Sequence, residues 1–516
     1  MQSHNQGRDQ GRWARADEPM SVKMPVPDQA VLGRRARIVA ALRAIVPGEG
    51  VIASETEMRP YESDALTAYR QMPMVVVLPS TLDQLCRVLK YCHAEGIKVV
   101  PRGAGTSLSG GALPAQDGVL LGLAKFNRIR EIDLENRVVV AEPGVTNLAV
   151  TQAVEAAGFY YAPDPSSQIA CTIGGNVAEN SGGVHCLKYG VTSNNVLGIE
   201  MALMSGELVR LGGKHLDSGG YDLLGVMTGS EGLLGIVTEV TVRILRRPEC
   251  ARALLVGFAT SEAAGDCVAR IIAAGIIPAG MEMMDRPAIH AVEEFVHAGY
   301  PLDVEALLIV ELDGVRAEVD HLLGRVEALA AECGAQTCRV STSEPERLLF
   351  WAGRKAAFPA VGRISPDYFC MDGTIPRARL PFVLERMRAM SKTHGLAVAN
   401  VFHAGDGNLH PLILYDANQP GELERAEAFG ADILRLCVEV GGVLTGEHGV
   451  GVEKRDLMPT MFSDIDLAQQ QRLKCAFDEQ GLLNPGKVFP TLHRCAELGR
   501  MHVRAGKLPF PDLPRF

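Results

Sequence analysis

Runs of apolar and polar residues divide the chain into two regions of different organisation. In the first region, apolar residues recur at helical spacing over residues 81–95. Short apolar runs at 74–78 and 97–100 flank this helix and predict strands. Residues 199–211 alternate around a Ser-Gly turn and predict a hairpin. The first region is therefore expected to be a mixed α+β domain that ends near Pro248.

The second region alternates predicted strands with long predicted helices. Strands are expected at 253–258 and 306–312, helices at 261–274 and 316–333, and the same alternation recurs at 380–394, 396–415 and 422–440. This order predicts helices packed on one antiparallel sheet, which would form a cap over the first domain.

Composition excludes several classes of protein. The chain has 516 residues, enough for two or three domains, and 47% of them are hydrophobic. A net charge of −10 and 5% aromatic residues argue against nucleic-acid binding. The N-terminus has no apolar segment typical of export signals, and no apolar run approaches a membrane span, so a cytoplasmic location is expected. The 12 cysteines include no C-x-x-C pair, which argues against an iron–sulfur cluster or a zinc ribbon.

Two glycine-rich loops are the strongest indication of a ligand. They are PRGAGTSLSGGALP at Pro101–Pro114 and a longer loop at Pro163–Gly190. Loops of this kind expose backbone N–H groups and can enclose a large anionic cofactor, with a dinucleotide as the first candidate. A Rossmann fingerprint is absent, because Leu108 stands where the third glycine would be. The stretch at 481–488 resembles a P-loop but lacks its Ser/Thr, and it predicts a turn.

A second constellation combines two histidines and a carboxylate. His403 and His410 delimit the run HAGDGNLH, and Glu447 and His448 belong to TGEHG. Two imidazoles and one carboxylate in glycine-rich turns could hold a divalent metal with positions open for substrate. His448 is then left to face the substrate, and an ordinary pKa of about 6.5 suits a general base at neutral pH. A metallohydrolase that uses the same three ligands and a water is an alternative at this point.

Several long motifs in one order carry a family resemblance. The runs PRGAGTSLSGG, TIGGNVAENSGG and TGSEGLLGIVTEVTVRI resemble the FAD-binding domain of the vanillyl-alcohol oxidase/p-cresol methylhydroxylase flavoproteins. The runs FHAGDGNLHP, TGEHGVGVEK and LNPGKVFP resemble the FAD-linked oxidase C-terminal domain of the D-2-hydroxy-acid dehydrogenase branch. Within that branch, Trp351–Arg377 is most similar to the FAD-binding catalytic subunits of glycolate oxidases. The implied fold is α+β, a two-part FAD-binding domain followed by a cap with an antiparallel sheet.

The resemblance implies FAD as the cofactor and names the residues that bind it. These are Arg102, Gly103, Ala104, Gly105, Thr106, Ser107, Gly110, Gly174, Gly175, Asn176, Ser181, Gly182, Tyr189, Ile236 and Asn484. Because Pro101–Pro114 contains neither His nor Cys, covalent attachment of FAD in this loop is excluded. The FAD is therefore expected to be noncovalent.

The resemblance also implies a reaction. His403, His410 and Glu447 would hold a divalent metal such as Zn, Mn or Fe, and Arg354 would bind the substrate carboxylate. His448 would remove the hydroxyl proton of glycolate while hydride passes to flavin N5, which gives glyoxylate. Apolar residues at Phe358, Cys370 and Leu412 favour a small substrate. D-lactate, oxidised without partner subunits, is the alternative, and a subunit that binds FAD only for structure is a third class.

Family architecture implies the domain boundaries and the partners. We expect a polar tail at 1–25, an FAD-binding domain at 26–248, a cap at 249–480, a return segment at 481–498 and a C-terminal tail at 499–516. The expected partners are a second FAD-binding-type subunit and an iron–sulfur subunit. Through this complex the chain would lie on the inner face of the cytoplasmic membrane.

Overall fold

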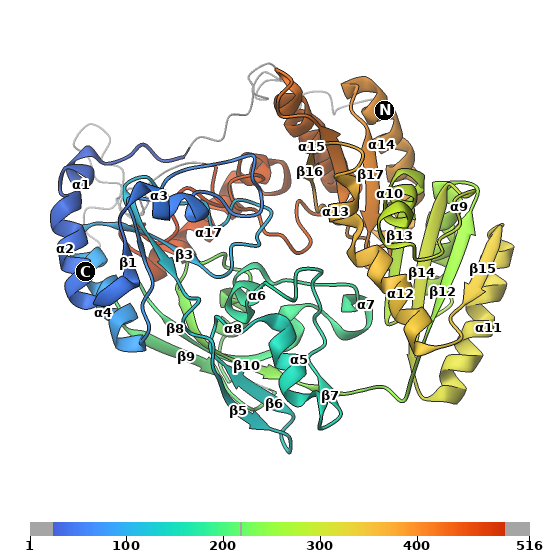
Figure 1. The fold of residues 1–516 in the computed structure, drawn as a ribbon, viewed down its shortest axis with the longest axis horizontal. Helices are drawn as coiled ribbons and strands as arrows, with labels where there is room; N and C mark the ends of the chain where they lie inside the picture. Colours follow the sequence, from blue (N-terminus) through green and yellow to red (C-terminus); the bar gives the residue numbers. More distant parts are fainter. Residues whose placement is uncertain (1–23, 217–218, 491–516) are drawn as a thin grey trace, which may run out of the picture.

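The computed structural model describes residues 24–216 and 219–490, and all but two residues of the predicted tails lie outside these ranges. Two halves lie side by side, with the N-terminal half drawn in blue to green and the cap in yellow-green to orange-brown (Figure 1). Among the described residues, no helix is long and apolar enough to cross a membrane.

The N-terminal half begins with a small sheet that is mostly parallel. Its strand order is β1-β2-β4-β3, with bounds Val51–Ile52, Val75–Val77, Gly118–Gly122 and Lys98–Arg102. The predicted helix at 81–95 is α4 (Leu82–Glu95), which connects β2 to β3. It begins where Thr81 Oγ1 accepts from the amide of Gln84 and ends at Gly96 in the left-handed conformation. The remaining helices of this part are α1 (Gln29–Gly33), α2 (Arg35–Ile45) and α3 (Glu55–Met58).

A second sheet in the N-terminal half has five antiparallel strands. Its order is β5-β6-β10-β8-β9, with bounds Ile129–Asp133, Val138–Ala141, Ile236–Arg243, Val196–Ala202 and Leu208–Gly212. The pairing of β8 with β9 confirms the predicted hairpin. A short ribbon pairs β7 (Phe159–Tyr160) with β11 (Leu245–Arg246). The helices are α5 (Asn147–Glu155), α6 (Ile173–Glu179), α7 (Cys186–Tyr189) and α8 (Leu223–Met227).

The cap is built on one antiparallel sheet of seven strands, as the strand and helix alternation predicted. Its order is β15-β12-β14-β13-β17-β18-β16, with bounds Thr337–Val340, Cys250–Phe258, Ala306–Gly314, Gly280–Asp285, Val398–Phe402, Pro411–Tyr415 and Asp367–Cys370. One core cluster joins the sheet to α9 (Ser261–Ala273), α11 (Arg316–Glu332), α14 (Leu380–His394) and α15 (Glu422–Glu439). Another joins it to α10 (Arg286–Val296), α12 (Glu344–Lys355) and α13 (Ala357–Val361). Helices therefore cover both faces of the sheet.

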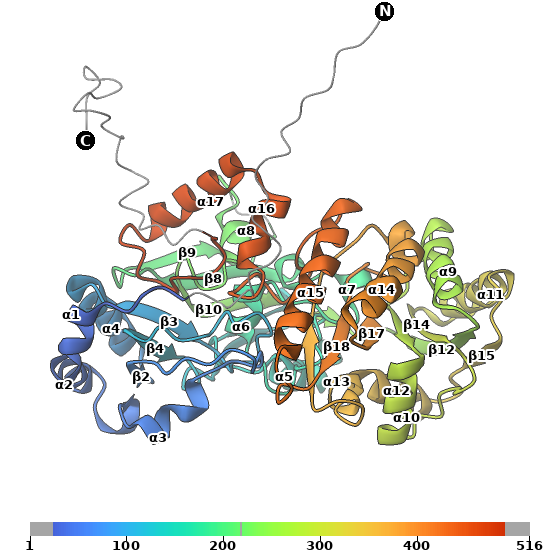
Figure 2. The same ribbon diagram turned by 90° about the horizontal axis from the view of Figure 1, so that it is seen from above.

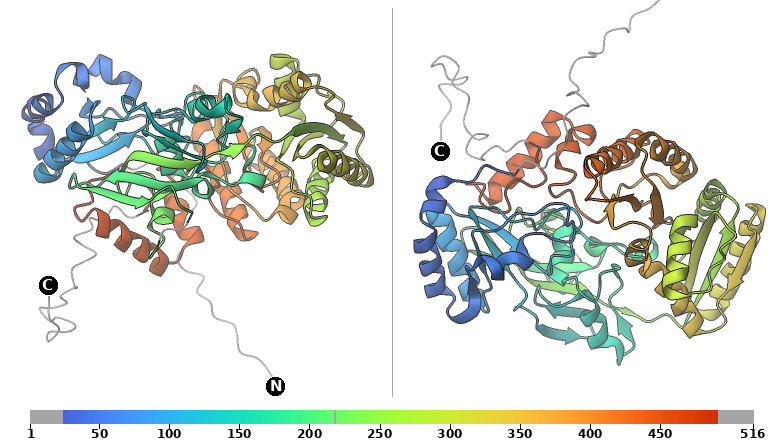
Figure 3. Two further views of the ribbon diagram at one scale, coloured as in Figure 1. Left: turned by 90° about the horizontal axis from the view of Figure 1, so that it is seen from below. Right: turned by 45° about the horizontal axis from the view of Figure 1, so that its top comes forward.

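The chain returns to the N-terminal half after the cap sheet. The amides of Val450 and Gly451 donate to the carboxylate of Glu231 in that half. The helices α16 (Met458–Met461) and α17 (Asp464–Phe477), drawn in red, lie beside the strands of the N-terminal half (Figures 2 and 3), and Lys474 Nζ of α17 donates to Leu233 O. Finally, Leu483 bridges to Val99 and the amide of Asn484 donates to Val99 O, so this segment lies beside β3; residues 491–498 of the expected return segment lie outside the described ranges. The last part of the described chain thus packs against the N-terminal half.

Candidate active site

A cavity with a volume of about 430 Å³ lies between the N-terminal half and the cap. Of the residues predicted to bind the cofactor, its wall includes Arg102, Gly103, Ala104, Gly105, Thr106, Ser107, Gly174, Gly175, Asn176, Ser181, Ile236 and Asn484. The same wall includes the predicted catalytic and metal-binding residues His448, Arg354, His403, His410 and Glu447. The fold therefore brings the two glycine-rich loops and the histidine cluster to one space.

The first loop has the features that an anionic cofactor requires. Within the described residues, the backbone amides from Gly103 to Thr106 donate no hydrogen bond to the protein. Gly105 has a φ of +76°, a conformation that favours glycine. A Cβ atom on Gly174 would lie 2.4 Å from Pro143 Cβ, so the second loop also depends on glycine. Free amides on a glycine-rich loop fit the pyrophosphate of FAD.

Three residues predicted to bind the cofactor lie outside the wall of this cavity. Gly110 packs against the C-terminal part of the chain, because its Cβ would lie 2.4 Å from Val452 Cγ2. Gly182 donates its amide to Glu447 Oε2 at 3.1 Å. Tyr189 donates its hydroxyl to Asp313 Oδ2 at 2.6 Å, across the boundary with the cap. These three positions support the arrangement of the two halves and do not face the cavity.

The turn between β17 and β18 brings the two histidines together beside Glu447. His403 Nε2 lies 3.1 Å and His410 Nε2 lies 3.3 Å from Glu447 Oε1. The two imidazole rings are nearly perpendicular, with centroids 4.9 Å apart. His410 is buried, and neither of its ring nitrogens makes a hydrogen bond within the described residues. A buried imidazole that makes no hydrogen bond and lies beside a carboxylate fits a metal-binding role.

The protonation of this cluster follows from its charges. Burial lowers the pKa of His403, but Glu282 and Glu447 outweigh this effect and raise the pKa to about 10. Burial raises the pKa of Glu447, yet His403 holds it at about 2. Burial, together with His448 and His403, lowers the pKa of His410 well below its ordinary value, so this ring is neutral, as a metal ligand must be. The carboxylates that hold a proton on His403 would also favour a divalent cation, whose binding releases that proton.

Glu282 connects the histidine cluster to the predicted substrate arginine, and sequence analysis did not identify it. Its Oε1 lies 2.7 Å from His403 Nδ1, and its Oε2 accepts from Arg354 Nε at 2.8 Å. Arg354 Nη2 lies 2.7 Å from the same Oε2, which leaves Nη1 buried without a partner in the described structure. Glu282 therefore orients His403 through its second nitrogen and leaves one edge of Arg354 free for a carboxylate.

Asp372 is a second residue that sequence analysis did not identify, and it fixes the loop that carries Glu447 and His448. Its Oδ2 accepts from the amides of Gly446, Glu447 and His448 at 3.0, 2.8 and 2.7 Å. Its Oδ1 lies 2.9 Å from Lys454 Nζ, and both side chains are fully buried. Three amides and one ammonium therefore hold this carboxylate ionised, and burial alone would have raised its pKa.

His448 lies against the cluster without joining its hydrogen bonds. Its ring stacks on His410 with centroids 4.8 Å apart and an interplanar angle of 15°. Its Nδ1 lies 4.0 Å from Asp372 Oδ2, which is too far for a hydrogen bond. Burial lowers the pKa of His448, although Asp372 and Glu447 oppose this effect. A neutral imidazole on the cavity wall can accept a proton. Asp372, His410 and His448 also lie close enough to form a second possible metal site.

The residues predicted to restrict the substrate lie in different places. Phe358 lines the cavity together with Tyr368, and its ring centroid is 6.4 Å from that of His410. Cys370 and Leu412 pair across β16 and β18 and belong to the core between the sheet and α10, α12 and α13. Of the three, only Phe358 faces the cavity, so the argument for a small substrate rests on Phe358 alone.

Comparisons with known proteins agree with this fold. The family model described as FAD linked oxidases, C-terminal domain, matches residues 247–488, and the FAD binding domain model matches residues 73–212. The glycolate oxidase subunit GlcD of Escherichia coli K12 is 56% identical over 93% of this chain and 97% of its own length. A D-lactate dehydrogenase of Anaerostipes hadrus is 30% identical over 87% of this chain and 97% of its own length. The structure of p-cresol methylhydroxylase with bound substrate aligns with a TM-score of 0.75 at 18% identity, covering 88% of this chain and 97% of that one.

Proposed function

The chain belongs to the FAD-linked oxidases, and we propose that within this family it oxidises glycolate to glyoxylate as the catalytic subunit of a glycolate oxidase complex. One observation carries this proposal. The unpartnered amides of the first glycine-rich loop line the same cavity as Arg354, His448 and the cluster of His403, His410 and Glu447. A non-catalytic FAD-binding subunit would not need this second set of residues, and a metallohydrolase would not need the glycine-rich loops.

Each group of residues has a chemical task in this proposal. Arg354 Nη1 binds the substrate carboxylate, and His448 removes the proton from the 2-hydroxyl group. Bound FAD would supply an acceptor for the two electrons that leave the substrate as hydride. His403, His410 and Glu447 would hold Zn, Mn or Fe, which supplies positive charge that favours the ionised hydroxyl. Glu282 keeps His403 and Arg354 in fixed orientations during these steps.

The cavity favours a small 2-hydroxy acid. Arg354 is 1% exposed and lies deep in the wall. The neighbouring cation, Lys355, lies 3.5 Å from Asp164 Oδ2 and already has a carboxylate partner. A second carboxylate on a longer substrate would therefore lack a free cation beside Arg354. D-lactate, which adds one methyl group to glycolate, is the second candidate, since a D-lactate dehydrogenase is among the relatives.

Electron transfer beyond the flavin is proposed to need partners. The possible metal-binding groups among the described residues contain His, Asp and Glu but no Cys, so they do not resemble an iron–sulfur site. We propose a second FAD-binding-type subunit and an iron–sulfur subunit as partners, on the inner face of the cytoplasmic membrane. The isolated chain should then be reduced by glycolate but react slowly with quinone, and co-expression with the partners should restore turnover. Rapid quinone reduction by the purified chain alone would argue against the complex.

Anaerobic flavin reduction tests the proposed function directly. The purified yellow protein is mixed with glycolate, D-lactate, L-lactate or 2-hydroxyglutarate, with and without a chelator. Bleaching of the flavin by glycolate, slower bleaching by D-lactate and loss of both after chelation are the expected results. A yellow protein that none of these acids bleaches would contradict catalysis, and a colourless protein would contradict FAD binding.

A further inference from the structure

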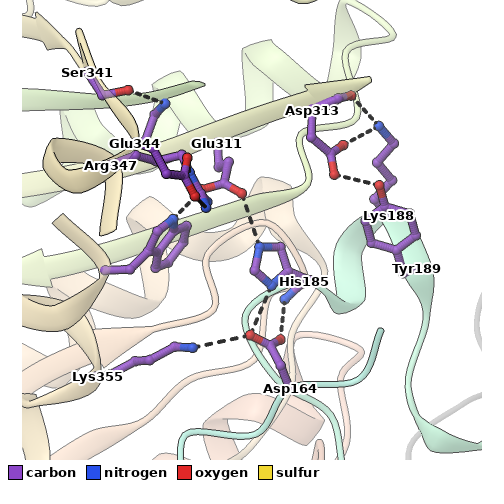
Figure 4. A network of polar contacts seen from close by, with 12 residues as sticks. Asp164, His185, Lys188, Tyr189, Glu311, Asp313, Ser341, Glu344, Arg347 and Lys355 are labelled. Carbon is purple, nitrogen blue, oxygen red and sulfur yellow. Dashed lines mark hydrogen bonds and ion pairs between the residues drawn. The ribbon is translucent and has the colours of Figure 1, made fainter. Parts of the chain in front are cut away.

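A polar network joins the two halves beside the cavity, and His185 lies at its centre (Figure 4). His185 belongs to the N-terminal half and directly precedes α7. Its Nδ1 lies 3.0 Å from Asp164 Oδ2 of the same half, and its Nε2 lies 3.3 Å from Glu311 Oε1 on β14 of the cap. One imidazole ring therefore bridges carboxylates from both halves.

The bridge is charged at neutral pH. Burial lowers the pKa of His185, but Asp164 and Glu311 outweigh this effect and raise the pKa to about 10. His185 in turn holds the pKa of Asp164 at about 2, although burial acts in the opposite direction. An imidazolium between two carboxylates makes charge-assisted hydrogen bonds, which are stronger and more directional than neutral ones.

Glu311 carries this contact into the helix that presents the predicted substrate arginine. Its Oε2 accepts from Arg347 Nη1 at 2.7 Å and also from Trp351 Nε1, and both donors belong to α12. Trp351 lies one turn before Arg354 on the same face of this helix. Glu311 therefore anchors α12 at Arg347 and Trp351, one turn before Arg354, whose guanidinium is held by Glu282.

Close packing leaves α12 little freedom at this point. A Cβ atom on Gly280 would lie 2.7 Å from Val184 O and 3.2 Å from the Trp351 ring. Val184 comes from the N-terminal half, yet it is buried in the core of the cap. At the end of α12, Lys355 contacts Asp164 as well. Residues next to Asp164, Pro165 and Ser166, line the cavity itself.

We propose that His185 is a positioning residue that sets α12, and thereby Arg354, against the cofactor cavity. This inference rests on the proposed function, in which Arg354 binds the substrate carboxylate. His185 would touch neither substrate nor cofactor and would act only through Glu311 and α12.

A neighbouring bridge provides a matched control. Asp313, also on β14, accepts from Lys188 Nζ at 2.5 Å and from the Tyr189 hydroxyl at 2.6 Å. This bridge joins the same segment to the same strand, but none of its contacts reaches α12. If His185 only stabilised the contact between the two halves, removal of either bridge would change substrate affinity by the same amount.

The experiment compares His185→Gln, Glu311→Gln, the double variant and Asp313→Asn in the FAD-loaded protein. The glycolate KM is measured from flavin reduction, and the affinity for oxalate, a carboxylate that cannot be oxidised here, is measured from the flavin spectrum. We expect His185→Gln to retain FAD, to raise the glycolate KM at least about tenfold and to lower the affinity for oxalate by at least about the same factor. The loss of kcat should be smaller, because a displaced binding group costs mainly substrate affinity. The double variant should be no worse than the more affected single variant, since both residues act through one contact. Asp313→Asn should lower the thermal midpoint of unfolding and leave the glycolate KM and the oxalate affinity unchanged.

Equal effects of His185→Gln and Asp313→Asn on oxalate affinity would overturn the inference, and so would no effect of His185→Gln. Glu311→Gln decides the question from the cap side if His185→Gln does not fold. If no 2-hydroxy acid reduces the wild-type flavin, the proposed function fails while oxalate affinity still reports on His185. A wild-type protein that does not bind oxalate would also overturn the inference.

Discussion

Replacement of Glu282 by glutamine is expected to weaken both the proposed metal site and the fixed orientation of Arg354. Glu282 is 1% exposed, and its two oxygens serve His403 and Arg354 separately. A glutamine has nearly the same shape, but one of its two positions becomes an NH₂ group. That group would face a donor, so one of the two contacts must be lost.

The expected loss of stability in Glu282→Gln follows from the charge that would remain buried. Arg354, itself 1% exposed, would keep its charge without the carboxylate that balances it. Breaking a buried ion pair costs about 3–5 kcal/mol, and because glutamine retains one acceptor we expect the lower end of this range. Loss of the group that orients a metal-binding histidine typically weakens metal affinity by about 10–100-fold, or roughly 1.4–2.8 kcal/mol.

Metal retention and thermal stability measure these two effects. Wild-type and Glu282→Gln proteins are dialysed against increasing chelator, and bound metal is determined by elemental analysis. Asp285→Asn is the control, because Asp285 is a buried carboxylate on the same strand that accepts from Asn400 at 2.7 Å and lies outside the cluster. Metal loss from Glu282→Gln at the same chelator concentration as wild type would refute the reasoning. If active wild-type protein contains no metal, the cluster is a polar cage for the substrate.

Four further results are expected. Gly174→Ala should abolish FAD binding because of the contact with Pro143, whereas Gly324→Ala, in a helix with open space around it, should retain the yellow colour. Acid precipitation of the wild-type protein should release all flavin into the supernatant; colour left on the pellet would indicate a covalent bond. His448→Ala should keep FAD but slow flavin reduction by about 10²–10⁴-fold in single-turnover measurements, as expected for loss of a general base, and near-normal reduction would remove His448 from the mechanism. Because the pKa of His185 is raised from 6.5 to about 10, its contribution to stability is complete below pH 6.5 and declines as the pH approaches 10. The difference in thermal midpoint between wild type and His185→Gln should therefore narrow over this range, since the facing Asp164 and Glu311 stay ionised and Arg347 stays charged; a constant difference would contradict the assigned charge.

Local patterns predicted much of the fold. The helix at 81–95 was predictable because its apolar spacing, the Thr81 cap and Gly96 all act within the helix itself. The range 396–415 was expected as one unit, although the run GDGN at 405–408 carries turn signals; the structure divides the range there into β17 and β18. Family motifs, by contrast, indicated which loops meet, and the cavity contains residues from each of them.

The residues that sequence analysis missed act through distant partners. Glu282 lies in the apolar run MEMMD, and a lone carboxylate in a predicted buried strand signals a buried partner. Its partners His403 and Arg354 are 121 and 72 residues away, so local patterns could not identify them. The family resemblance implies that Tyr189 binds the flavin, and in the structure its hydroxyl donates to Asp313 on the cap. Tertiary packing brings the partners of Glu282 and Tyr189 to them, and it has no local signal in the sequence.

The return of the chain to β3 has a consequence for the order of events during synthesis. Asn484 Nδ2 donates to the carbonyl of Gly111, which lies 373 residues earlier. At about 5–20 residues per second, the ribosome needs on the order of 20–75 s to make the intervening chain. During this time the first glycine-rich loop lacks the segment that completes its cavity, and contacts so distant in sequence form slowly. Tight binding of FAD should therefore follow translation of the cap. A nascent chain that is arrested on the ribosome before residue 481 should hold no tightly bound flavin.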